Sequence, residues 1–183
     1  EHNLVLLLRL IEQLPTNPVC ELDLALVSSL NDAALATIAS REGWQLNGAQ
    51  LLRDDALPIT VHRDAFQSVL QHSDLVIGMA GTAIEQAVGL AKPALQIAGQ
   101  GPQFTSAFAE AQRRLLGPTV FCAPGDSGSQ ANLQASAELV TALLERYGND
   151  PHFQQQLRTE AVRRLGTHGG GLRMAAAISA LLP

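Results

Sequence analysis

The chain has 183 residues, a formal net charge of −5, and a composition that is 46% hydrophobic but only 16% charged. The negative charge disfavours non-specific nucleic-acid binding, which needs a basic surface, and no nucleic-acid partner is expected. The apolar content excludes an intrinsically disordered chain, and the length predicts a single domain. No run reaches the ~18 apolar residues of a membrane-spanning helix.

The two cysteines and the first residues indicate the cellular compartment in which the protein resides. Cys20 and Cys122 lack metal-ligand spacing and adjoin apolar residues, so we expect buried free thiols in a reducing environment. No basic segment of a secretory signal is visible, which adds to the prediction of a cytoplasmic protein. The chain has no initiator methionine and begins in an apolar helical pattern, so we expect a fragment of a longer protein.

The first half of the chain alternates helical and strand patterns. Apolar residues at helical spacing predict a first helix, capped by Asn3 and ended by Pro15 and Pro18; they are Leu4, Leu7, Leu8, Ile11 and Leu14. Four further elements follow: a strand at 22–28, a helix capped by Asn31 or Asp32, a strand at 58–62, and a helix capped by Asp64. Residues 44–57 indicate only a short strand and a turn at Asn47-Gly48.

The second half continues the alternation. Strands are predicted at 74–79, 94–98 and 119–122, and helices after Gly81, at about 103–116, and at 132–147, 151–165 and 171–182. This order predicts an α/β fold, a Rossmann-like, mostly parallel sheet with helices on both faces. Such sheets bind ligands at the carboxyl ends of their strands, so the informative residues should lie directly after strands.

The strongest candidate site lies in residues 74–86, where an apolar strand runs through Gly81 and Thr82 directly into a helix. A helix start offers unpaired N–H groups and a positive dipole end, which suit a phosphate, and Gly81 permits close approach. Glu85, on the first turn, could accept hydrogen bonds from sugar hydroxyls. The alternative is an ordinary strand–helix turn with a glutamate that stabilises the helix dipole.

A second candidate follows the next strand. Gln103 and Thr105 stand at a predicted helix start, where their amide and hydroxyl groups suit an uncharged polyol such as a sugar; the alternative is a capping loop. We expect this turn and the Gly81 turn to line one cleft. Phe104 and Phe108 at i, i+4 spacing favour core packing over a ligand platform.

A third candidate is His62-Arg63, at the end of another strand. A backbone amide there could read a base edge and Arg63 could meet a phosphate, although a solvated strand end explains the pair equally well. No clustered carboxylate pair is present, so neither a metal nor another cofactor is expected.

The order of these pieces resembles the donor domain of GT-B glycosyltransferases. Residues 73–77, 80–85 and 89–93 resemble the donor motif of lipid-A-disaccharide synthase and its relatives. Residues 101–105, 108–110 and 112–117 resemble a subgroup related to that synthase. The resemblance covers roughly residues 1–182 and is specific over 73–117.

The resemblance implies an inverting hexosyl transfer from a UDP-sugar, of the UDP-N-acetylglucosamine type, in lipid biosynthesis. It implies that Glu85 holds the ribose hydroxyls, that Gly81 and Thr82 contact the diphosphate, and that Gln103 faces the sugar or diphosphate. The backbone near Val61-His62 would face uracil.

The chain departs from the family in two ways that limit what it could do alone. It lacks the strand and glycine-rich turn before the first helix, and it lacks the acceptor domain with the catalytic base. The acceptor, for which a lipid-linked molecule is one option, would bind that absent domain. Peripheral membrane association and dimerisation of the full-length protein are left open. Two alternatives also stay open: a nucleotide-sugar-binding regulatory domain without turnover, and half of a UDP-sugar epimerase.

The absent strand poses a structural problem. A doubly wound sheet normally has its first strand at the centre, and an empty central slot would leave two rows of backbone groups unpaired. Either upstream residues fill the slot or residues 4–10 enter the sheet. We favour a helix over 4–14, because Ile11 and Leu14 continue the same apolar stripe. The slot then has to be closed by something else, such as a partner chain or a rearranged strand order.

Overall fold

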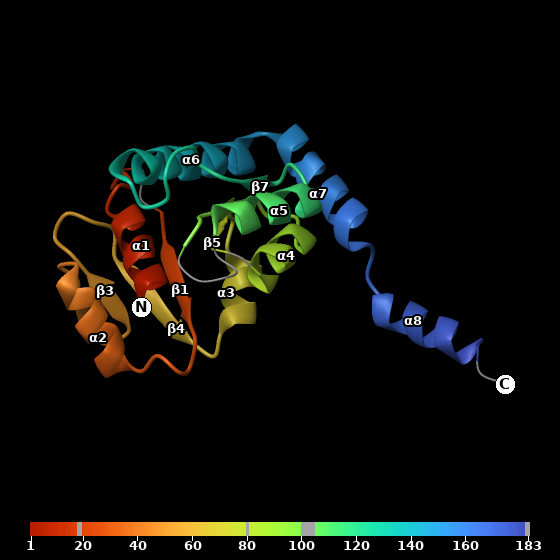
Figure 1. The fold of residues 1–183 in the computed structure, drawn as a ribbon, viewed down its shortest axis with the longest axis horizontal. Coiled ribbons are helices and arrows are strands. Elements are labelled where there is room, and N and C mark those ends of the chain that lie inside the picture. The colour runs from red at the N-terminus through yellow and green to blue at the C-terminus, as the bar shows by residue number, and fades with distance from the viewer. Residues whose placement is uncertain (18–19, 80, 100–104, 182–183) are drawn as a thin grey trace.

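The computed structural model describes residues 1–17, 20–79, 81–99 and 105–181 as an α/β fold (Figure 1). The elements of the first half are α1 (His2–Ile11), β1 (Leu22–Leu26), α2 (Asp32–Arg41), β2 (Gln45–Asn47), β3 (Gln50–Leu52), β4 (Ile59–Arg63) and α3 (Phe66–His72). Those of the second half are β5 (Val76–Gly78), α4 (Thr82–Gly89), β6 (Ala94–Gln96), α5 (Ser106–Leu116), β7 (Val120–Phe121), α6 (Gln130–Asn149), α7 (Pro151–Leu165) and α8 (Gly170–Ser179).

The first sheet has the strand order β1-β4-β3-β2. Strands β1 and β4 run parallel, in register from Leu22 opposite Ile59 to Leu26 opposite Arg63. Strands β2 and β3 form an antiparallel hairpin that pairs with β4, which confirms the turn predicted at Asn47-Gly48. Helices α1 and α2 cover this sheet through a core cluster that includes Trp44, which is fully buried.

The second sheet is parallel throughout, in the order β5-β6-β7, and is covered on both faces. Neighbouring residues of a strand point to opposite faces. Ala94 of β6 packs in a cluster with Ile84 and Val88 of α4, whereas Leu95 packs in a cluster with residues of α1 and α6. The predicted parallel strands flanked by helices on both faces are confirmed for this sheet.

The predicted mostly parallel sheet is divided in the described residues, since the strands form two separate sheets. Strands β1 and β5 each lie at the end of their own sheet. The helix predicted for the start of the chain is confirmed, and it does not enter either sheet. Together with α6, which runs across the molecule in Figure 1, α1 builds an apolar cluster that joins the two sheets. The expected central slot is therefore present between β1 and β5.

Local predictions at helix starts are partly wrong. Glu1, and not Asn3, occupies the N-cap position of α1, because the helix begins one residue before Asn3. Asp64 adopts a positive φ of 51°, and Ala65 takes the N-cap position of α3 without a side-chain cap. Asn31 caps α2 as predicted, accepting a hydrogen bond from the Ala34 amide at 2.9 Å.

Burial also differs from prediction at three places. The predicted strand at 74–79 shortens to Val76–Gly78 and is only half-buried, because one edge of β5 has no strand beside it. Cys20 and Cys122 are free thiols, as predicted, but Cys20 is half-buried and Cys122 is exposed. Phe108 is 36% exposed rather than part of the core.

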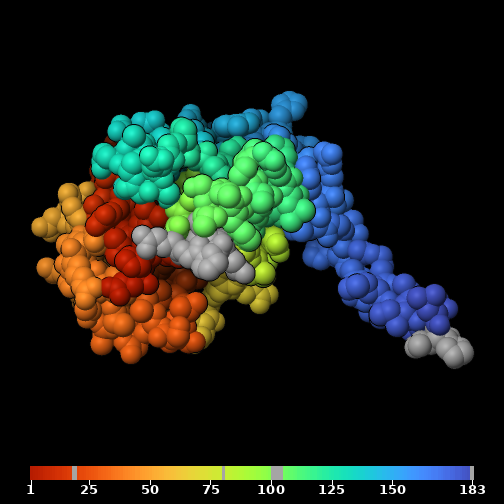
Figure 2. All heavy atoms as spheres, viewed as in Figure 1, coloured from red at the N-terminus to blue at the C-terminus, as the bar shows by residue number. Residues whose placement is uncertain are grey.

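The last two helices differ in how they pack against the rest of the domain. Helix α7 packs on α4 and α5, whereas α8 buries none of its residues and stands clear of the rest of the described chain (Figure 2). In the described ranges, none of the helices combines the length and apolarity needed to cross a bilayer.

An ion-pair cluster on α7 holds the end of α5. The Glu160 carboxylate, whose side chain is 10% exposed, accepts hydrogen bonds from Arg164 Nε at 3.1 Å and Arg163 Nη1 at 3.3 Å. Arg164 also donates to the Leu115 carbonyl, at 3.1 Å. Hydrogen bonding from Arg164 lowers the pKa of Glu160 below its ordinary value.

Because this pKa is lower in the folded state, the stabilisation is present above the unfolded value of about 4.3 and is lost as the pH falls through the folded value. We expect Glu160→Gln to lower the free energy of unfolding at pH 7 and to flatten its decline as the pH falls below about 5. Urea unfolding at a series of pH values measures this. Glu138→Gln, on the exposed surface of α6, is the control. An unchanged acid dependence in the Glu160 variant would contradict the assignment.

Candidate functional site

Three segments meet at the carboxyl edge of the second sheet. Gly78 and Gln96 end β5 and β6 side by side, and the Ile97 amide donates to the Gly78 carbonyl at 2.9 Å. A Cβ added to Gly99 would lie 2.6 Å from Asn3 Oδ1 and 3.0 Å from Met79 Sδ. The amino end of α1 therefore packs against the turns that follow β5 and β6. The described parts of these two turns share one edge of the sheet, and the single cleft expected there stays a prediction.

Gly81 forms the N-cap of α4 in a conformation that other residues rarely adopt. Its φ is 82° and its ψ is −158°, a region essentially restricted to glycine. Among the described residues, its two chain neighbours apart, a Cβ added to Gly81 would meet no atom within 4 Å. The glycine is thus required by the backbone conformation and not by the space around it.

A buried glutamine on α5 holds this turn through both polar groups of Gly81. The Gly81 amide donates to Gln112 Oε1 at 3.2 Å, and Gln112 Nε2 donates to the Gly81 carbonyl at 3.0 Å. Because Gln112 is only 6% exposed, this pair is shielded from water. The amide predicted to contact a diphosphate is therefore already engaged within the protein.

A second glutamine extends the network into the sheet. Gln96, 2% exposed, donates through Nε2 to Gln112 Oε1 at 2.8 Å and to the Met79 carbonyl at 3.1 Å. Both partners are acceptors, which sets the orientation of the Gln96 amide. Gln96 Oε1 is buried and has no hydrogen-bond partner among the described residues. The network links β5, β6 and α5 at the base of the turn.

Thr82 and Glu85 lie on the first turn of α4, where the sequence places them. Thr82 is exposed and Glu85 is partly exposed. The first amides of an α-helix have no intrahelical acceptor, so those of Thr82 and Ala83 lie where an anion could accept from them. Among the described residues, the Glu85 carboxylate forms no ion pair or hydrogen bond. It is therefore not committed to a structural contact within that part of the chain.

Thr105 is the N-cap of α5, and its Oγ1 accepts a hydrogen bond from the Phe108 amide at 3.2 Å. The sequence analysis gave such a capping role as the alternative to a sugar contact. The hydroxyl proton of Thr105 still remains available to a ligand. Gln103, the predicted sugar contact, lies outside the described residues.

His62 and Arg63 belong to the other sheet, and their side chains are engaged there. His62 Nε2 lies 2.6 Å from Asp23 Oδ1 on the neighbouring strand β1. Arg63 forms an ion pair with Asp32, the first residue of α2, and donates to the Leu30 carbonyl at 2.6 Å. Among the described residues, neither side chain hydrogen-bonds to α4 or α5. Arg63 thus holds β4 against the start of α2.

Lys92, part of the glycosyltransferase-like motif, has a structural role. Its side chain is buried, and Nζ donates to the Gln71 carbonyl at 2.9 Å and to the Ser73 carbonyl. Burial lowers the pKa of the ammonium group. The lysine ties the end of α3 to the loop before β6.

Sequence reasoning did not single out Gln96 or Asp23. It considered Asp32 only as a helix cap, and it included Gln112 only as part of the family-like segment 112–117. A signal for Gln112 was present: it shares the helical stripe of Ala109 and Leu116, both buried, so a polar residue occupied an apolar position. A buried glutamine needs hydrogen-bond partners, and the stripe could have indicated one. Nothing in the local pattern pointed to Gly81 as that partner.

The comparisons give the chain no family. No protein-family model matches it, and no curated protein matches it. Within the described ranges, histidine, cysteine, aspartate and glutamate side chains do not gather in any group of three that could hold a metal ion.

The conformation of Gly81 leads to a stability test. We expect Gly81→Ala to lower the free energy of unfolding by about 1–3 kcal/mol, the cost of holding a non-glycine residue in this region. Gly148→Ala is the matched control, because Gly148 lies within α6 and its added Cβ also meets nothing within 4 Å. That control should be neutral or stabilising, since alanine favours helices. Equal effects of the two substitutions in chemical denaturation would contradict the strain argument.

The glutamine network leads to a second test. We expect Gln112→Leu to destabilise the fold by about 1–3 kcal/mol, because the Gly81 amide loses its acceptor, the Gly81 carbonyl loses one of its donors, and the Gln96 amide keeps only the Met79 carbonyl. Gln155→Leu on α7, where the glutamine is exposed, is the control. Hydrogen exchange should also accelerate at the start of α4 in the Gln112 variant alone. Unchanged exchange there would mean that Gln112 does not hold the turn.

Proposed function

We propose that this chain is the donor-binding domain of a UDP-sugar-dependent glycosyltransferase, similar to lipid-A-disaccharide synthase and its relatives. The proposed donor is a UDP-hexose of the UDP-N-acetylglucosamine type. The diphosphate binds at the amino end of α4, at Thr82 and Ala83, and Glu85 accepts hydrogen bonds from the ribose hydroxyls. Gln103 and Thr105 contact the sugar or diphosphate, and the backbone at His62 faces uracil.

The observation that carries this proposal is the pairing of an uncommitted carboxylate with a rigidly held helix start. Glu85 stands on the first turn of α4, and Gln112 holds that turn from beneath through Gly81. A carboxylate at a helix start repels a phosphate unless the two are separated along the ligand. A nucleoside diphosphate meets this requirement, because its ribose hydroxyls donate hydrogen bonds while its diphosphate accepts them.

The chemistry proposed for this site is electrostatic. Transfer of the sugar leaves negative charge on the UDP diphosphate, and the helix dipole with its free amides stabilises that charge as it develops. The acceptor and the catalytic base come from a further domain of the full-length protein. Two free thiols, Cys20 and Cys122, fit the reducing cytoplasm in which we place the enzyme.

Calorimetry with UDP and a panel of nucleotide sugars tests the proposal. We expect Glu85→Ala to weaken UDP binding by about 1.5–3 kcal/mol, the range for hydrogen bonds to a charged group. Gln86→Ala, at the next and exposed position of α4, should leave the affinity unchanged. A chelator should not weaken binding.

Three outcomes would contradict the proposal. Equal UDP affinities of the Glu85 variant and the parent chain would mean that Glu85 stabilises the helix dipole and does not bind the ligand. Absence of UDP binding altogether would mean that this chain does not bind the proposed nucleotide. Loss of binding on chelation would mean that a metal carries the diphosphate.

A further inference from the structure

The two-glutamine network leaves one polar atom unsatisfied. Gln96 Oε1 is buried, and no group in the described part of the chain donates a hydrogen bond to it. The nitrogen of the same amide is engaged twice, since Nε2 donates to Gln112 Oε1 and to the Met79 carbonyl. The unpaired acceptor therefore lies beneath the turn at Gly81, shielded from water. A buried polar group without a partner costs free energy, and its presence in a native structure requires an explanation.

Gln112 has the donor that Gln96 lacks, but its amide faces Gly81 instead. Gln112 Oε1 accepts from the Gly81 amide at 3.2 Å, and Gln112 Nε2 donates to the Gly81 carbonyl at 3.0 Å. Two side-chain amides can also pair with each other through two reciprocal N–H···O bonds, because each carries a donor and an acceptor. One of these two bonds, from Gln96 Nε2 to Gln112 Oε1, is already formed at 2.8 Å. The network thus has a second arrangement, in which Gln112 Nε2 donates to Gln96 Oε1.

The backbone of Gly81 determines what this second arrangement requires. The Gly81 carbonyl also accepts from the amides of Ile84 at 3.2 Å and Glu85 at 3.5 Å, so it stays satisfied when Gln112 turns away. The Gly81 amide, in contrast, then loses its acceptor. The start of a helix attracts an anionic oxygen, and a phosphate oxygen is an acceptor of that kind. The second arrangement is therefore complete only with an anion at the Gly81 amide.

We propose that Gln112 is a positioning residue that changes its partner on ligand binding, from Gly81 in the free protein to Gln96 in the bound protein. A phosphate oxygen takes the Gly81 amide, Gln112 is released, and its Nε2 satisfies Gln96 Oε1. Both glutamines act from beneath the site, since Gln112 is 6% and Gln96 2% exposed. The ligand shifts this equilibrium because only the second arrangement offers it the Gly81 amide. The inference rests on the proposed anion site at the start of α4, but not on the anion being a nucleotide.

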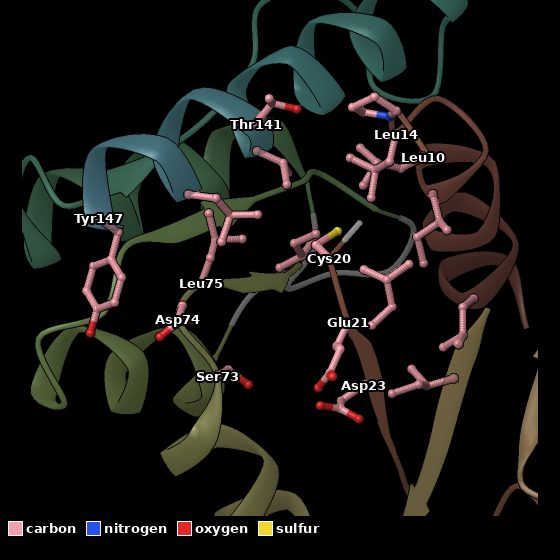
Figure 3. Close-up of a pocket in the computed structure, with 18 of the residues that line it drawn as sticks. Leu10, Leu14, Cys20, Glu21, Asp23, Ser73, Asp74, Leu75, Thr141 and Tyr147 are labelled. Carbon is pink, nitrogen blue, oxygen red and sulfur yellow. The ribbon is translucent and has the colours of Figure 1, made fainter. Parts of the chain in front are cut away.

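A separate hollow lies between β1 and β5, a groove of about 1050 Å³ (Figure 3). The described residues that line it include Leu10 and Leu75, but not Gly81, Gln96 or Gln112. A molecule bound in this groove would therefore not touch the glutamine network. Residues of the groove serve as an internal control for the place of binding.

NMR titration of the full chain with UDP and, separately, with pyrophosphate tests the change of partner. We expect the Gly81 amide signal to shift together with the side-chain amide signals of Gln96 and Gln112, with one dependence on ligand concentration. The amide signal of Leu75, in the groove, should stay unchanged. This measurement uses the parent chain and does not depend on the folding of any variant.

Two substitutions should change the affinity for these probes in different ways, as measured by calorimetry. Gln96→Met should weaken binding about tenfold or more, because release of Gly81 then leaves the buried Gln112 Oε1 without a donor. Gln112→Met should bind at least as tightly as the parent chain, because its Gly81 amide is already free. Gln86→Met, at an exposed position of α4, is the matched control and should leave the affinity unchanged. A merely structural support of the turn would make both glutamine variants bind more weakly.

The outcomes separate this inference from the proposed function. Coupled shifts with pyrophosphate but not with UDP would support the change of partner and contradict the proposed nucleotide. A shift of Gly81 with UDP that leaves the side-chain amides of both glutamines in place would overturn the change of partner and leave the nucleotide proposal intact. Weaker binding in both glutamine variants would overturn it as well, and so would the absence of any shift at Gly81 with either probe.

Discussion

An apolar cluster made by α1, β6 and α6 holds together two sheets that share no backbone ladder in the part of the chain that the structure describes. Leu10 and Leu95 are fully buried in it, and Leu133 and Val140 nearly so. Burial of each such side chain contributes about 1.5–3 kcal/mol, which is why side chains alone can hold the two halves together. Hydrophobic contact is non-directional, however, and does not satisfy the backbone groups at the edges of β1 and β5. A groove is left between those strands because side-chain contacts, and not backbone pairing, hold the two sheets together.

The polar counterpart of that cluster is the glutamine network beneath the β5–α4 turn. Gln112 holds both backbone groups of Gly81, and Gln96 holds Gln112 from the sheet. In a water-excluded setting each of these hydrogen bonds is strong, and each would be costly to break. The position of Glu85 thus depends on a side chain 27 positions further along the chain, and a substitution at Gln112 acts on the proposed site without touching the ligand.

The groove and the proposed nucleotide site belong to one architectural feature. In doubly wound sheets, ligands bind outside the carboxyl ends of the strands where the strand order reverses. The reversal falls between β1 and β5, and the Gly81 turn follows β5 directly.

Prediction from the sequence succeeded where a local pattern was sufficient. Apolar periodicity located α1, α6 and α7 closely, and Gly81 was correctly placed at the strand–helix turn. Parallel strands followed from the alternation of strands and helices. The pattern was less successful at helix starts such as Asp64, because a cap depends on a backbone angle that composition does not specify.

By itself, the sequence determined the order of the elements, the helical state of residues 4–10, and the chemistry available after each strand. It also indicated that a central strand position would be open. Only the tertiary structure decided that the sheet divides into two, that Gln112 reaches Gly81, and that Arg63 is engaged by Asp32. The physical reason is the same in each case. Backbone ladders and buried hydrogen bonds join residues far apart in the chain, and local periodicity carries no information about such partners.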